Sequence, residues 1–130
     1  MKIAALIARI LLGLVFVVFG LNGFFNFIHQ PPMPGPAGEF AGAMMTSHSF
    51  LAVAAIEVIG GALLLAGQFI PLALTVLGPV IFNILMFHIF MAPTGLPIAV
   101  VVAVLWFIVF LYVRSAFAGI FAQHVPLGPV

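Results

Sequence analysis

A single carboxylate stands near the middle of a membrane-length apolar stretch. Residues 50–68 read FLAVAAIEVIGGALLLAGQ, and Glu57 is the one charged side chain among them. An ionised carboxylate in hydrocarbon costs about 3 kcal/mol or more. Glu57 therefore needs a polar partner or has to stay protonated, and we expect it to be largely protonated at neutral pH. Because a neutral carboxyl group can donate a hydrogen bond and exchange a proton, Glu57 is the candidate catalytic residue.

Three asparagines are candidate ligand-binding partners of this carboxyl group. Counted from the ends of their predicted helices, Glu57, Asn22 and Asn83 lie roughly 9 to 14 Å deep on the same side of the membrane. Asn26 follows Asn22 by four residues and so shares its helix face. If these faces converge, they form a polar pocket for the head group of a lipophilic small molecule, such as a quinone carbonyl. The alternative is that these residues only join helices by hydrogen bonds, although such a role does not need a carboxylate.

Arg9 is the fifth candidate, and it starts from the other membrane surface. It lies roughly 9 Å in from that surface. It either reaches Glu57 as a buried ion pair or pairs locally and extends towards the head groups. Its helix face is about 100° or more from the face of Asn22 and Asn26, so it does not easily join the same cluster as both amides.

Several kinds of site are disfavoured by residue type. The chain has no cysteine, which excludes disulfides and thiolate metal sites. No phosphate-binding loop or dinucleotide fingerprint occurs. Three basic residues are too few to track the phosphates of a nucleic acid. His88 lies about 140° around its helix from Asn83. We therefore predict that the histidines make ordinary hydrogen bonds and bind neither metal nor haem.

The composition requires that lipid be the solvent for most of the chain. Of its 130 residues, 66% are hydrophobic and 4% are charged, which a soluble domain of this size cannot hide. We predict one all-α domain over residues 1–130, a membrane four-helix bundle with spans at about 3–28, 49–68, 71–91 and 95–118. The first span begins like a signal peptide, but bulky aromatic residues continue it and we expect it to be retained. Four prolines predict a non-helical loop over 29–38, followed by a short interfacial helix over 39–48.

The few charges predict the orientation. With four spans, all three basic residues, Lys2, Arg9 and Arg114, fall on one side of the membrane. The positive-inside rule then places both termini in the cytoplasm.

Several motifs resemble those of the DoxX family of small bacterial membrane proteins. They are RILLGLVFVVFG at 9–20, the E-x-x-G-G element from Glu57 to Gly61 with the later Gly67 and Pro71, and Pro79 with Asn83 and His88. The resemblance implies a four-helix bundle in the bacterial inner membrane. Some members resemble a subunit of thiosulfate:quinone oxidoreductase, and others are associated with membrane redox complexes. A lysine that many relatives carry near position 22 or 23 is absent here.

Two functions of different classes follow. The first is a redox-associated subunit whose outer pocket binds quinone or a similar lipophile and whose electrons come from a partner protein. It would serve as an accessory subunit of a quinone-linked oxidoreductase. The second is a scaffold of a membrane complex, or of a homo-oligomer, with no ligand of its own. A small-solute transporter is disfavoured, because one four-helix chain has few polar residues to line a path.

Overall fold

Four long apolar helices form an antiparallel bundle. The computed structural model describes residues 1–128, and within them it contains five α-helices, two short 3-10 helices and no strand. The elements in chain order are α1 (Lys2–Phe25), α2 (Gly35–Thr46), α3 (Ser49–Ala66), α4 (Ile70–Phe90), η1 (Pro93–Gly95), α5 (Leu96–Val113) and η2 (Arg114–Phe117). The four spans predicted from the sequence correspond to α1, α3, α4 and α5 with η1 and η2, which are long and apolar enough to cross a membrane. The predicted four-helix membrane bundle is confirmed.

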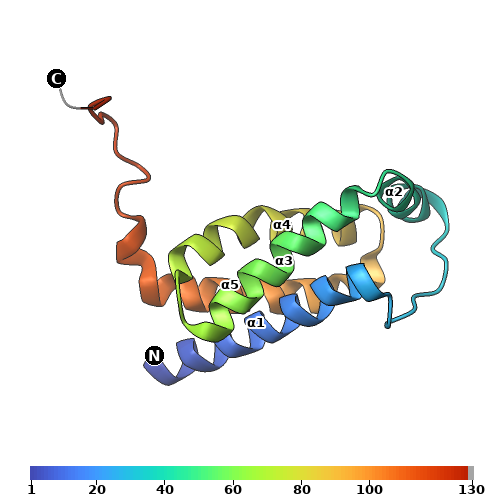
Figure 1. Cartoon of the computed structure of the whole chain (residues 1–130), viewed down its shortest axis with the longest axis horizontal. Coiled ribbons are helices and arrows are strands. Elements are labelled where there is room, and N and C mark those ends of the chain that lie inside the picture. The colour runs from blue at the N-terminus through green and yellow to red at the C-terminus, as the bar shows by residue number, and fades with distance from the viewer. Residues whose placement is uncertain (129–130) are drawn as a thin grey trace.

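The four spanning helices form a ring in which each contacts two neighbours. Helix α1 packs against α3 and α5, and α4 packs against the same two helices. The short helix α2 crosses one end of the bundle (Figure 1). The N-terminus and the segment that follows η2 lie together at the other end (Figure 1), as four antiparallel spans require.

Helix α2 begins earlier than the sequence indicated. The prediction of a non-helical segment over 29–38 is wrong at its C-terminal end, because α2 starts at Gly35 and has Pro36 in its first turn. A proline costs little there, since the first N–H groups of a helix have no intrahelical partner. The preceding turn is eased by Gly35, whose φ of 66° glycine adopts without the steric cost of a Cβ atom.

The connection between α3 and α4 is a tight turn, as the short gap between the predicted spans 49–68 and 71–91 requires. Gly67 ends α3 in the left-handed conformation with φ 68°. The N–H of Gly67 donates to the carbonyl of Leu64, and the N–H of Gln68 donates to that of Leu63. This pair of bonds is the Schellman motif, which satisfies the last carbonyls of a helix. Pro71 then lies in the first turn of α4, so the two helices are antiparallel neighbours.

Glycines bring the backbones of α1 and α3 into contact. A Cβ atom on Gly61 would lie 2.8 Å from the carbonyl oxygen of Gly13 and 2.8 Å from the backbone nitrogen of Val17. One on Gly20 would lie 2.9 Å from the carbonyl oxygen of Ala54. In lipid there is no hydrophobic drive between helices, so this close approach through small residues supplies the attraction.

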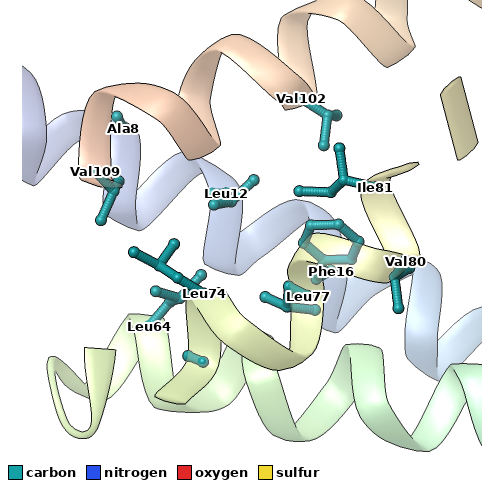
Figure 2. Packing of buried hydrophobic residues seen from close by; sticks show 11 residues of the cluster. Ala8, Leu12, Phe16, Leu64, Leu74, Leu77, Val80, Ile81, Val102 and Val109 are labelled. Atoms are coloured by element: carbon teal, nitrogen blue, oxygen red, sulfur yellow. The ribbon is translucent and has the colours of Figure 1, made fainter. Parts of the chain in front are cut away.

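The adjacent glycine faces a different helix. A Cβ atom on Gly60 would lie 2.7 Å from Cγ of Leu77 in α4. Gly60 and Gly61 therefore place α3 between α1 and α4. The core of the bundle is filled by apolar side chains from all four spans, as Figure 2 shows for Leu12 and Phe16 of α1, Leu77 of α4 and Val102 of α5.

A hydrogen bond joins α5 to α4 near Pro79, the proline inside α4. Nε1 of Trp106 donates to the carbonyl oxygen of Leu74 at 3.0 Å. Its ring lies against Gly78, where a Cβ would be 3.7 Å from Cζ2. Pro79 follows within the helix and removes one backbone hydrogen bond. The indole therefore adds a hydrogen bond between α4 and α5 where the ladder of α4 is interrupted.

We predict that the substitution Gly61→Ala lowers the free energy of unfolding by about 1–3 kcal/mol, as overpacking typically does. The atoms in the way are backbone atoms of α1, which cannot rotate aside. Gly42→Ala is the matched control, because a Cβ on Gly42 of α2 meets nothing within 4 Å and alanine favours a helix by about 1 kcal/mol. Unfolding of the detergent-solubilised variants measures both. Equal stability of the two variants would contradict the close approach of α1 and α3.

We also predict that residues 34 and 123 lie on opposite sides of the membrane. The chain has no cysteine, so single cysteines at Pro34 and Gln123 are unique labels. In intact cells an impermeant thiol reagent should modify the first cysteine, and the second only after permeabilisation. Labelling of both from one side would refute four spans, and the reverse pattern would refute cytoplasmic termini.

Candidate functional site

A cavity of about 520 Å³ lies between α2, α3 and α4. Its lining includes residues of α2, the helix that crosses the end of the bundle farther from the N-terminus (Figure 1). Three of its lining side chains are polar, namely Glu57, Asn83 and His88. The others are apolar: Phe40, Ala41, Met44, Met45, Phe50, Val53, Val80, Ile84 and Phe87.

Glu57 reaches this cavity because of the glycine pair that follows it. Gly60 contacts Leu77 of α4, and Glu57 lies one helical turn before Gly60, on nearly the same face. Since α3 and α4 are antiparallel, one turn back along α3 corresponds to one or two turns forward along α4. That step leads from Leu77 to Val80 and Asn83, which line the cavity with Glu57.

Helix α2 covers the cavity with large apolar side chains. Phe40, Met44 and Met45 are all on the lining. The ring of Phe40 lies 5.6 Å from that of Phe87, centroid to centroid. In the structure this face of α2 is therefore turned to the cavity between α3 and α4.

The two polar groups deep in the membrane differ in exposure. The side chain of Glu57 is half-buried, whereas that of Asn83 is exposed. Asn83 is seven residues from the end of α4, or roughly 10 Å along the helix. An exposed side chain on the lining of the cavity is accessible to a molecule that occupies it. Among residues 1–128, no hydrogen bond joins the Glu57 carboxyl group to a neighbour.

His88 contributes an acceptor at the rim. Its Nδ1 lies 3.0 Å from the carbonyl oxygen of Ala92. A carbonyl can only accept, so Nδ1 carries the proton and Nε2 of the neutral ring has a free lone pair. Because His88 and Asn83 lie on different faces of their helix, the sequence analysis did not assign them to one site. In the structure both residues line the same cavity.

The other two asparagines are used within the end of α1. Oδ1 of Asn22 accepts a hydrogen bond of 2.6 Å from the N–H of Ile28. Asn26 ends α1 in the left-handed conformation, with φ 49°, which asparagine tolerates better than most residues. Neither residue is part of the cavity lining.

Arg9 lies at the other end of α3. Its Nη1 donates to the carbonyl oxygen of Leu64 at 3.0 Å, and the missing side chain of Gly67 makes room for the guanidinium. A cation at a helix C-terminus is favoured by the helix dipole. Leu64 is seven residues beyond Glu57, roughly 10 Å along α3. Of the two alternatives for Arg9, the structure shows local pairing and not an ion pair with Glu57.

Metal ligands do not gather in the described part of the chain. Residues 1–128 contain no group of three or more His, Cys, Asp or Glu side chains placed to hold a metal ion. The groups that face the cavity are a carboxyl, an amide and an imidazole, which suit hydrogen bonding to an organic head group.

Comparison with protein families gives one match. The family model described as DoxX matches residues 4–89, which include nearly all of α1, all of α2 and α3, and nearly all of α4. Glu57, Asn83 and the glycine pair fall inside the matched range. Searches of curated proteins and of solved structures found no match.

We predict that Asn22→Ala lowers the free energy of unfolding by about 1 kcal/mol, because the N–H of Ile28 loses its acceptor. Asn22→Asp keeps an acceptor oxygen and should restore most of the loss. Lipophile binding should be unchanged in both variants. Thermal unfolding and ligand binding of the same preparations test this. A stable Asn22→Ala protein that no longer binds ligand would instead place Asn22 in the binding site.

Proposed function

The chain belongs to the DoxX family of membrane proteins, and from this premise we propose that it is a redox-associated membrane subunit that binds a quinone or similar lipophile. The cavity between α2, α3 and α4 is the proposed site. A volume of about 520 Å³ is within the usual range for small-molecule pockets.

One observation carries the proposal. Glu57 and Asn83 face a shared cavity of otherwise apolar lining, and the carboxyl group is bonded to no neighbour within residues 1–128. A residue kept to join helices would bond across an interface. A carboxyl group held at membrane depth without a protein partner suits a ligand that completes its hydrogen bonding.

The polar groups match both forms of a quinone. A neutral Glu57 and the amide of Asn83 can donate to carbonyl oxygens, and Nε2 of His88 can accept from a hydroxyl. The phenylalanines of the lining, Phe40, Phe50 and Phe87, supply apolar faces for a ring. Because Asn83 is exposed at membrane depth, a lipophile can enter directly from the bilayer.

The redox role requires a partner. Reduction of a quinone to its quinol takes up two electrons and two protons. Glu57 is placed to exchange a proton with a bound head group. The chain has no cysteine and no nucleotide-binding motif, so a partner oxidoreductase would deliver the electrons. We place the protein in the bacterial inner membrane with cytoplasmic termini, which puts the cavity in the outer half of the bilayer.

The decisive experiment compares two carboxyl-to-amide substitutions. We predict that Glu57→Gln retains binding of a short-chain quinone within a few-fold, because an amide still donates. Partner-linked quinone reduction should fall by about 10²-fold at every pH tested, because an amide cannot relay a proton. Glu39→Gln is the matched control, as Glu39 is the only other acidic residue and is exposed on α2 outside the lining.

Binding itself is tested separately from proton transfer. Asn83→Leu should weaken quinone binding by about tenfold, the cost of one or two lost hydrogen bonds. Equal binding and reduction by wild type and both cavity variants would refute the proposal. Purified protein that carries no lipophile, with Glu57→Gln indistinguishable from wild type, would support the scaffold alternative.

A further inference from the structure

The basic residues of the chain gather at one end without acidic partners. Lys2 and Arg9 are on the first turns of α1, and Arg114 follows α5 at the same end of the bundle (Figure 1). The only two acidic side chains are Glu39 on α2 and Glu57 on the half of α3 towards α2. Neither acidic side chain therefore lies at the end of the bundle where the basic residues gather, and the negative charge that balances them has to come from another group.

Two of these cations and a phenol line one groove. A depression of about 170 Å³ lies between α1, α5 and the start of α4. Lys2, Arg9 and Tyr112 contribute its polar groups. The remaining lining is apolar and consists of Ala5, Leu6, Ile70, Val109 and Val113. The cationic rim of this groove complements the charged head of an anionic phospholipid, and its apolar trough complements the hydrocarbon chain.

Arg9 is already held in place within this groove. One of its five N–H donors is used by the carbonyl oxygen of Leu64, and its side chain is half-buried. The remaining donors are oriented by that bond. A guanidinium fixed in this way loses little freedom on binding an oxyanion, which favours phosphate recognition.

We propose that this groove binds the phosphate of an anionic phospholipid. Arg9 and Lys2 pair with the head group, the hydroxyl of Tyr112 donates to it, and an acyl chain lies along Leu6, Ile70 and Val109. Basic pockets between membrane helices are suited to such head groups. The site is separate from the cavity of α2, α3 and α4, and it does not depend on the proposed function.

The experiment is a lipid titration followed by native mass spectrometry of the purified full chain. Phosphatidylglycerol is the anionic probe, phosphatidylcholine the zwitterionic one, and inorganic phosphate the free anion. Lys2→Gln and Arg9→Gln should each weaken phosphatidylglycerol binding by about five-fold, and Tyr112→Phe should cause a smaller loss. Arg114→Gln is the matched control, because it removes the same charge outside the groove lining and should leave binding unchanged.

The outcomes separate the possible causes. Since Arg9→Gln also removes a bond to α3, it is not relied on alone, and Lys2→Gln and Tyr112→Phe test the groove in a fold that keeps that bond. Equal losses in Lys2→Gln and Arg114→Gln would overturn the site in favour of diffuse surface charge. Displacement of the lipid by millimolar inorganic phosphate, or equal binding of phosphatidylcholine, would also overturn it.

Discussion

The contact between the backbones of α1 and α3 is the constraint on which the rest of the molecule depends. At Gly13 and Gly61 each helix occupies the space that a side chain of the other would need. This contact fixes the rotation of α3 about its own axis. Gly60 then has to face α4, and Glu57, one turn earlier, has to face the gap between α3, α4 and α2. The orientation of the carboxyl group thus follows from glycines that it does not touch.

Helix α3 also connects the two candidate sites at opposite membrane faces. Its N-terminal half provides Glu57 to the cavity beneath α2, and its C-terminus receives the guanidinium of Arg9 at Leu64. The left-handed Gly67 serves both the turn into α4 and the approach of Arg9. A larger side chain there would strain the backbone and displace the arginine. The turn and the cationic groove are therefore coupled through one residue.

Apolar run length was sufficient to predict the four spans and the short connection before Pro71. Residue spacing grouped Glu57 with Asn83, and these two residues line one cavity. Helical phase within single helices could not predict which hydrogen-bond partner a side chain would find across a turn or interface. Asn22 accepts from Ile28 beyond the end of its helix, and Arg9 donates to the carbonyl of Leu64 on the neighbouring helix, where Gly67 leaves room for the guanidinium. His88 lines the cavity together with Asn83, a grouping that helical phase alone argues against.

Whether Glu57 serves packing or ligand binding depends on which group forms hydrogen bonds with its carboxyl group. Trp106 shows how this fold uses a polar group for packing: its N–H is bonded across an interface to Leu74. Asn22 and Arg9 are likewise bonded to backbone groups. Glu57 differs, because its carboxyl group faces a largely apolar cavity and is bonded to no neighbour within residues 1–128. A polar group left without a partner at this depth lowers stability. A ligand that bonds to it would recover that loss, and this gives a lipophile with a carbonyl or hydroxyl head an advantage over the acyl chains around it.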